Sequence, residues 1–205
     1  MRRLTSAVPT QISRLSLDSL SFFLVSVSII VNFFIFTQVV SQDTAMAIKA
    51  AFIPTFAMSG LLLRPIFAGG WNFKPVDKNT LIMTMAGGAA ALGILGFSAA
   101  ISPMATVNGT LFYVNMAIVE EVFFNYFLFA WICTVYPWPV AALLTGLFFA
   151  PFHIGVYGIN LAFMAYAVIA RIVLCTAYYA SGSLSAAMIA HMAFNFIAVG
   201  SVIAP

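Results

Sequence analysis

The chain has 205 residues, of which 63% are hydrophobic and 6% are charged, and its mean hydropathy is +1.09. Segments this apolar and this poor in charge exclude an ordinary soluble domain and predict an integral membrane protein. The formal net charge of +3 comes without a basic patch interleaved with aromatic residues. It therefore fits contact with anionic lipid better than nucleic-acid binding, and we expect no nucleic-acid partner.

Apolar runs of helix length follow one another along the chain. The first run comes after Arg2 and Arg3, and because it holds no small-residue cleavage site we expect an uncleaved span. The predicted fold class is all-α: a polytopic transmembrane helical bundle of about seven spans, with its polar site in the C-terminal half. The candidate spans are residues 17–40, 45–63, 80–101, 110–135, 138–155, 158–180 and 183–204.

The second run is the least uniform of these candidate spans. It contains Lys49 and Pro54 and stops at Arg64 and Pro65. Long basic side chains can reach from a span to the membrane interface, and a proline can kink a transmembrane helix. We therefore expect snorkelling and a kink to accommodate these residues within one span.

The distribution of basic residues predicts an orientation. They cluster before the first span and between the second and third, where a polar loop lies at residues 71–79, whereas the connection between the first two spans has only Asp43. By the positive-inside rule, the N-terminus lies in the cytoplasm and the C-terminus outside. The expected location is thus the cell membrane, crossed several times.

Two adjacent carboxylates, Glu120 and Glu121, lie inside the apolar run 110–135, although the whole chain has five acidic residues. An ionisable group at bilayer depth costs about 2.5–3.5 kcal/mol on insertion scales, so such groups are usually functional or paired. This stretch is therefore the first candidate for a site.

The chain's two histidines, His153 and His191, lie in later and separate apolar runs. His191 is four residues before Asn195, a spacing that puts both on one helix face. With a rise of about 1.5 Å per residue, Glu120 lies about 15 Å and His191 about 12 Å along its span. Pro151 can bend His153 inward, so we expect these groups to meet near the bilayer midplane.

Such a set of side chains suits hydrolysis. A buried carboxylate and an imidazole that share one water can remove its proton, because a carboxylate removed from solvent is a stronger base. An imidazole and an amide on another helix can donate hydrogen bonds to the oxyanion of a tetrahedral intermediate. The candidate catalytic residues are Glu120, His153, His191 and Asn195.

Three motifs occur in order on separate spans: Glu120-Glu121-x-x-x-Asn125, Phe149-x-x-x-His153 and His191-x-x-x-Asn195. Together they resemble the motifs of the CAAX protease and bacteriocin-processing (CPBP or Abi) family of intramembrane endopeptidases, which is related to the type II CAAX prenyl endopeptidases. The resemblance covers residues from about 107 to 200. It implies an N-terminal transmembrane region at residues 1–106 and a catalytic core at residues 107–205.

The resemblance also implies roles. Glu120 with His153 would activate the water, and His191 with Asn195 would form the oxyanion hole, without a metal or other cofactor. The implied partner is a hydrophobic or lipid-tethered peptide or protein substrate, prenylated substrates included. The expected enzyme is a glutamic intramembrane protease.

One position departs from the family pattern. The first motif of the family usually ends in arginine, where this chain has Asn125. An arginine four residues after Glu121 would pair with that carboxylate, whereas asparagine offers a neutral hydrogen bond. We hypothesise that Arg171, an arginine deep within an apolar run, supplies the missing guanidinium. Phe149 is expected to pack against the site and do no chemistry.

Other interpretations stay open from the sequence. The two glutamates can be a structural pair held by Asn125, Arg171 or waters, and His153 alone is typical of a hydrogen bond between helices. The chain could be a catalytically silent scaffold or immunity protein, or a small ion- or proton-coupled transporter. A glutamate with two histidines also suits catalytic zinc by ligand type, although Cys133 and Cys175 show no zinc-knuckle spacing.

Overall fold

The computed structural model describes the backbone of residues 15–39, 44–68, 73–74, 78, 115–154 and 158–203, and the side chains of 15–30, 54–68, 78, 115–154 and 158–195. These residues are mostly helical. The predicted span at residues 80–101 and most of the predicted polar loop at 71–79 lie outside the described residues.

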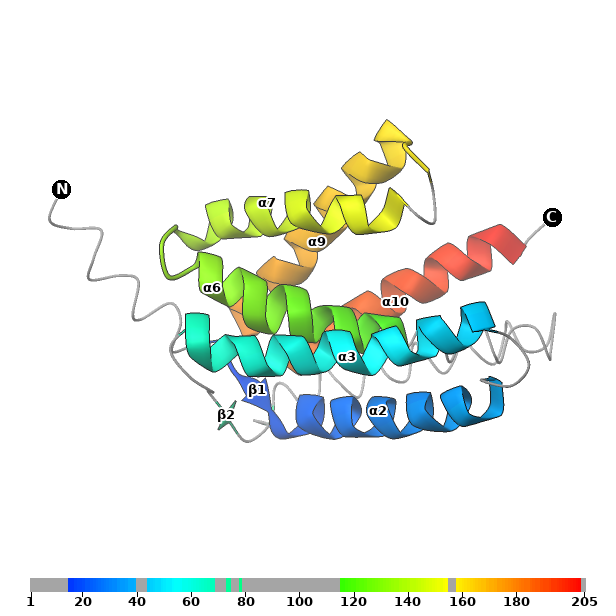
Figure 1. Ribbon diagram of the computed structural model, residues 1–205. Coiled ribbons are helices and arrows are strands. Elements are labelled where there is room, and N and C mark those ends of the chain that lie inside the picture. The colour runs from blue at the N-terminus through cyan, green and yellow to red at the C-terminus, as the bar shows by residue number, and fades with distance from the viewer. Residues whose placement is uncertain are drawn as a thin grey trace, which may run out of the picture.

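Long helices make up most of the fold (Figure 1). The helix of residues 115–120 continues as η1 and α6, with η1 in the wider π-helical form. The predicted runs agree with the helix positions to within a few residues wherever the backbone is described. The elements are α2 (Ser19–Val39), α3 (Thr44–Phe67), η1 (Glu121–Phe129), α6 (Ala130–Ile132), α7 (Trp138–Phe149), the 3-10 turn η2 (Ala150–His153), α9 (Leu161–Ser181) and α10 (Leu184–Ile203).

A two-stranded parallel sheet departs from the all-α expectation. It pairs β1 (Leu17–Asp18) with β2 (Phe73–Lys74) in register at both positions. The predicted first span included Leu17 and Asp18, but the helix begins only at Ser19. The side chain of Asp18 explains this start, since its Oδ1 accepts from Ser21 N at 2.9 Å and so satisfies an amide of the first helical turn.

Local sequence signals set both ends of α9. The side chain of Asn160 accepts hydrogen bonds from the amides of Ala162 and Phe163, at 3.0 and 3.3 Å, and so caps the helix start. The helix stops at Gly182, which has φ 68° in the left-handed region where glycine carries no steric penalty. This turn leads directly into α10.

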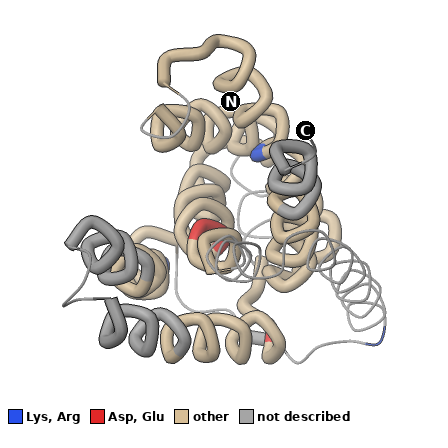
Figure 2. The backbone as a smooth tube through the Cα atoms, turned by 90° about the vertical axis from the view of Figure 1, so that its right-hand side faces the viewer, with Lys and Arg blue, Asp and Glu red and all other residues tan. Residues whose placement is uncertain are grey.

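The helices pack around the one that contains η1. That helix has α3 on one side, while α9 contacts both α7 and α10. Contact with α3 is close at Gly60, where an added Cβ would lie 2.8 Å from the carbonyl oxygen of Val122. Viewed from the end, acidic positions lie on this central helix, and most other described positions carry no charge (Figure 2).

Arg64 does not snorkel, contrary to the expectation from sequence. Its side chain is completely buried and donates through Nη2 to the carbonyl of Leu15 at 2.9 Å and through Nη1 to the carbonyl of Tyr126. Its guanidinium carbon also lies 4.3 Å from the centre of the Tyr126 ring. The arginine stays inside because backbone carbonyls and an aromatic face replace the water that it would otherwise seek.

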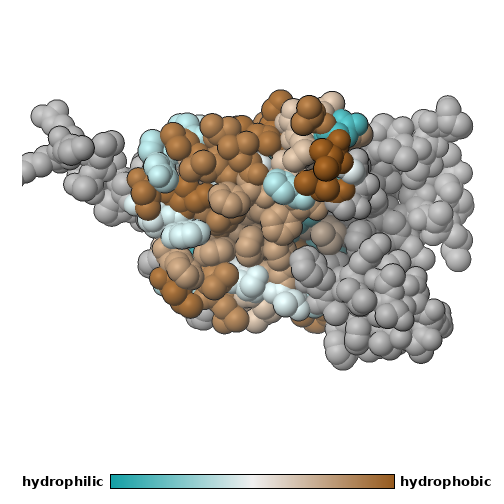
Figure 3. All heavy atoms as spheres, turned by 45° about the horizontal axis from the view of Figure 1, so that its top comes forward, coloured by the Kyte–Doolittle hydropathy of each residue, from teal (hydrophilic) through white to brown (hydrophobic). Residues whose placement is uncertain are grey.

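Two described helices are long and apolar enough to cross a membrane: Asn115–Ile132 and Leu161–Ser181. They differ in surroundings, with 72% of the first and 28% of the second buried inside the protein. Among residues with described side chains, shorter apolar helical stretches are Ser19–Ile30 in α2, Trp138–His153, and Leu184–Asn195 in α10. One face of the molecule is largely hydrophobic at its surface (Figure 3). The number of spans, the orientation and the division at residue 106 stay predictions.

Candidate active site

The candidate site lies where the helix of residues 115–132 meets α9 and α10. Glu120 is the last residue before η1 and Glu121 is its first residue, so the change from α to π geometry occurs between the two carboxylates. π-Helical segments are rare and occur often at functional sites. Arg171 comes from the middle of α9, and His191 comes from α10.

Glu121 is fully buried and is held by three donors. Its Oε1 accepts from Arg171 Nη1 at 2.6 Å and lies 2.7 Å from His191 Nδ1, while its Oε2 accepts from the amide of Asn125. A carboxylate oxygen can only accept, so the hydrogen of the His191 ring lies on Nδ1 in this contact. Glu121 thereby fixes the orientation of the His191 ring and makes no hydrogen bond to the other ring nitrogen, Nε2.

Glu120 has a more open environment. Its side chain is 12% exposed, and its Oε2 lies 3.6 Å from Arg171 Nη2 and 3.6 Å from His191 Nε2. These separations are longer than direct hydrogen bonds, so the interaction with the Arg171 guanidinium is mainly Coulombic. Of the two carboxylates, Glu120 is the one with room for a further partner.

Arg171 is enclosed by charge on one side and by aromatic rings on the other. It is completely buried, and its guanidinium carbon lies 3.8 Å from the ring centre of Phe149 and 5.0 Å from that of Phe124. An aromatic face stabilises a desolvated guanidinium, which offsets part of the cost of burying it. Phe149 thus packs under the ion pair, in the position expected for a supporting residue.

Asn125 and Cys175 continue the polar contacts behind Glu121. The thiol of Cys175 donates to Asn125 Oδ1 at 2.9 Å, and this contact orients the amide so that its nitrogen faces Glu121. Both residues are fully buried. Asn125 therefore gives Glu121 a neutral hydrogen bond, while the guanidinium comes from Arg171 on another helix.

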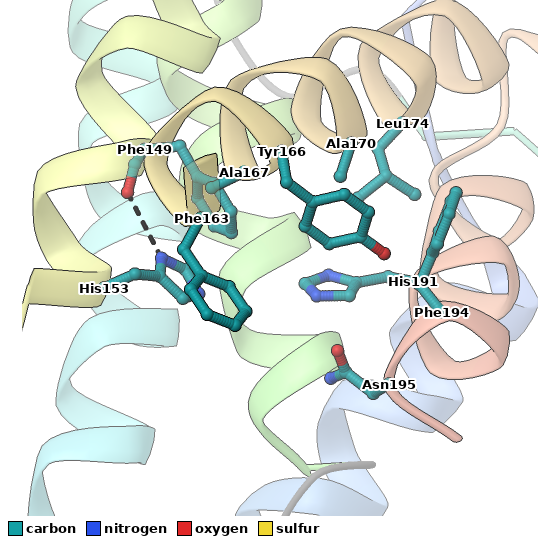
Figure 4. A pocket seen from close by; sticks show the side chains of 10 residues that line it. All are labelled: Phe149, His153, Phe163, Tyr166, Ala167, Ala170, Leu174, His191, Phe194 and Asn195. Atoms are coloured by element: carbon teal, nitrogen blue, oxygen red, sulfur yellow. Dashed lines mark hydrogen bonds between the residues drawn. The ribbon is translucent and has the colours of Figure 1, made fainter. Parts of the chain in front are cut away.

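A small cavity of about 110 Å³ lies beside this ionic cluster (Figure 4). Its polar groups belong to His153, Tyr166, His191 and Asn195, all labelled in Figure 4. His153 Nδ1 lies 3.4 Å from the carbonyl of Phe149, one turn earlier. The apolar lining is Phe149, Phe163, Ala167, Ala170, Leu174 and Phe194.

The predicted site residues thus form two groups that share His191. One is the ionic cluster of Glu120, Glu121 and Arg171, and the other is the cavity with His153 and Asn195. The contacts described for Glu120 are with Arg171 and His191, whereas the predicted mechanism pairs Glu120 with His153. The catalytic roles of all these residues stay predictions.

Sequence reasoning did not identify Tyr166 or Cys175 as part of the site. A signal existed for both, because Tyr166, Ala170 and Leu174 are spaced by four and Cys175 is four residues after Arg171. Residues at this spacing share one face of a helix. Cys175 thus lies on the face of α9 that carries Arg171, whereas Tyr166 belongs to a second row with Ala170 and Leu174.

Within the part of the chain that the structure describes, no three His, Cys, Asp or Glu side chains group as ligands for a metal ion. Metal independence of the reaction stays a prediction that chelation can test.

Comparison with known proteins adds a finding that does not depend on this geometry. Residues 102–197 match the family model described as Type II CAAX prenyl endopeptidase Rce1-like. No curated protein and no solved structure matches the chain. The matched region contains all three motifs and Arg171, and it confirms the resemblance seen in the sequence. Residues 102–197, a little under half of the chain, are therefore similar to the Rce1-like family of type II CAAX prenyl endopeptidases, an integral membrane protease family.

Proposed function

We propose that the protein is an intramembrane endopeptidase that hydrolyses a peptide bond of a membrane-associated substrate, with prenylated C-termini as the first class to test. One observation carries the proposal. Glu120 is a partly open carboxylate that faces His191 beside a cavity that also holds His153 and Asn195. This arrangement brings a potential base and potential oxyanion donors to one place.

In the proposed mechanism, Glu120 with His153 removes a proton from a water that attacks the peptide carbonyl. The water's oxygen bonds to the carbonyl carbon, and the carbonyl electrons move to its oxygen. When the tetrahedral intermediate collapses, the C–N bond breaks and the proton passes from the glutamate to the leaving amine. Water and peptide bond are thus converted to a carboxylic acid and an amine with no other reactant.

His191 and Asn195 stabilise the oxyanion in this proposal. His191 Nδ1 already donates to Glu121, so donation to the oxyanion requires a second hydrogen on Nε2. The resulting imidazolium and Arg171 together balance the charges of Glu120 and Glu121. The proposed step therefore leaves no buried charge unpaired, and balanced charges cost less to desolvate than an unpaired one.

The shape of the cavity supports an apolar substrate segment. Apart from its histidines, Tyr166 and Asn195, it is lined by aliphatic and phenyl groups, and Phe163 and Tyr166 are each about half exposed at 48% and 53%. An apolar chain next to the scissile bond would exclude water other than the attacking one. This favours lipid-tethered over freely soluble peptides.

The first experiment measures cleavage of a quenched prenylated peptide by the purified protein in bilayers, beside the same peptide without the prenyl group. Glu120→Gln and His191→Ala are the test variants. Thr176→Val is the matched control, because its hydroxyl donates to the Ile172 carbonyl of its own helix and has no place in the site. We expect the parent and the control to cleave and both test variants to fail while remaining folded.

Two outcomes would overturn the proposal. No cleavage of this peptide or of a broad membrane-peptide library, with all variants as stable as the parent, would point to a catalytically silent protein. Unfolding of both test variants would assign the cluster a structural role.

A third outcome concerns the mechanism alone. Loss of parent activity on chelation, with stoichiometric bound zinc, would replace the metal-free mechanism by a metal-dependent one.

A further inference from the structure

A short segment outside the matched family region contacts the helices that carry the site. We call residues Leu15–Asp18 the N-terminal strap. It includes β1 and lies next to the turn between α9 and α10, where Ser16 forms a parallel bridge with Ser183. The strap is also buried, with Leu15, Ser16 and Asp18 each 2% exposed or less.

The strap supplies the N-terminal cap of α10. The first amides of a helix have no partner within it and need acceptors from elsewhere. The amide of Leu184 donates to the carbonyl of Ser16 at 3.3 Å, and the amide of Ser185 donates to Asp18 Oδ2 at 3.0 Å. A carboxylate at this position also interacts favourably with the helix dipole. Two of the first amides of α10 are thus satisfied by residues far away in sequence.

Further bonds hold the end of α9. The amide of Ser16 donates to the carbonyl of Gly182 at 3.2 Å, and its hydroxyl donates to the same oxygen at 2.5 Å. The hydroxyl of Ser183 donates to Asp18 Oδ2 at 2.5 Å. The turn that joins α9, which carries Arg171, to α10, which carries His191, is therefore hydrogen-bonded to the strap at the end of α9 and at the start of α10.

Arg64 links the same strap to the helix of the carboxylates. It donates to the carbonyl of Leu15 at 2.9 Å and to the carbonyl of Tyr126 within η1, which begins at Glu121. The strap is thereby connected to all three helices that supply the ionic cluster. Among the bonds from the strap to α10, those of the Asp18 side chain can be removed by a single substitution.

We propose that Asp18 is a positioning residue for catalysis, which holds α10 at the depth and rotation that bring His191 and Asn195 to the reacting carbonyl. His191 lies about 10 Å, or two turns, from the capped end, so a shift at the cap moves it as part of a rigid helix. A misplacement of about 1 Å in a catalytic group can cost about a hundredfold in rate. The kinetic part of this inference rests on the proposed function.

The test variant is Asp18→Asn, which keeps the size of the side chain but has one accepting oxygen where aspartate has two. Ser26→Ala is the matched control, because it removes a hydroxyl that donates to the Phe22 carbonyl on the exposed side of α2. With folded protein well below its unfolding temperature, we expect kcat to fall about a hundredfold with little change in KM. A merely structural role would lower the unfolding temperature and leave kcat per folded molecule unchanged, and that result overturns the proposal.

A second arm does not need activity. In Asp18→Asn, hydrogen exchange of the amides at the start of α10 should become faster, and unchanged exchange overturns the proposal. Ser16→Cys with Ser183→Cys should form a disulfide, because residues paired in a β-bridge lie within the reach of such a bond, and this disulfide should restore kcat in the Asp18→Asn background.

If Asp18→Asn does not fold, Ser183→Ala takes its place in both assays, with a smaller fall in kcat expected. A parent without activity refutes the proposed function alone, since exchange and disulfide formation still decide the role of the strap.

Discussion

Glu120 and Glu121 are neighbours in the sequence but lie in different environments. Glu121, with Asn125, Arg171 and Cys175, forms a closed side in which both carboxylate oxygens accept short hydrogen bonds and the side chain has no exposed surface. Glu120 forms an open side, 12% exposed and 3.6 Å from the nitrogens of Arg171 and His191 that face it. The comparison suggests a division of work, in which one carboxylate holds the helices in place and the other reacts.

The largest expected effect comes from removing the cation of the closed side. Arg171→Met leaves Glu121 buried without its main counter-charge, and breaking a buried ion pair in this way typically costs about 3–5 kcal/mol. Chemical unfolding in detergent would measure the loss, and activity should disappear with it. The double variant Arg171→Met with Glu121→Gln should be less destabilised than the sum of the two single variants. If Arg171→Met keeps both stability and activity, Arg171 does not replace the arginine missing at position 125.

On the open side, substitution of Glu120 should lower the catalytic rate and leave the free energy of unfolding nearly unchanged. Glu120→Gln is expected to lower kcat by about 10²–10⁴, the usual contribution of a general base. Its free energy of unfolding should change by less than about 1 kcal/mol, because no short bond to Glu120 is lost. Glu121→Gln is the matched comparison and should lose stability as well. Equal behaviour of the two variants in both assays would contradict the division of work.

An intermediate effect is expected at Asn125. Asn125→Leu removes the amide that donates to Glu121 Oε2 and leaves that oxygen buried without a donor, at a cost of about 1–3 kcal/mol. Thr176→Val, on a neighbouring helix, serves as a control for the loss of a hydrogen-bonding side chain away from the charges. A change at Asn125 no larger than that control would mean that Arg171 and His191 alone hold Glu121.

The smallest effect tests the far end of the closed side. Cys175→Ala removes the thiol that orients the Asn125 amide and should destabilise the protein by about 1 kcal/mol. Cys175→Ser keeps a donor and should retain more stability than the alanine variant. Thermal unfolding of the three proteins under one set of conditions makes the comparison. A serine variant less stable than the alanine variant would show that the thiol acts by packing, and not by its hydrogen bond.

Composition was enough to locate the described helices to within a few residues, because each coincides with an apolar run, and Asn160 and Gly182 mark the two ends of α9. The motifs and the isolated Arg171 also indicated which side chains to examine together. A charge inside an apolar run is a local signal, and it is visible without the fold.

Features that depend on contacts between distant segments could not be predicted. Arg64 was expected at the interface, because nothing in its own run shows that the carbonyls of Leu15 and Tyr126 surround it. Asp18 looked like a residue at the edge of a span, since its bond to Ser185 joins positions 167 residues apart. The π-helical form of η1 has no sequence pattern of its own.

That π-helical segment sets how the site responds to a change in the length of the chain. Its hydrogen bonds join residues five apart, so it contains more residues per turn than the α-helical segments on either side. Deleting one residue between Val122 and Phe129 would let this segment return to the α form, and the residues on either side would keep nearly the same relative rotation. The same deletion in an ordinary α-helix would turn every residue before it by about 100° relative to those after it. One residue can therefore be lost from this segment without turning Glu120 away from Arg171 and His191.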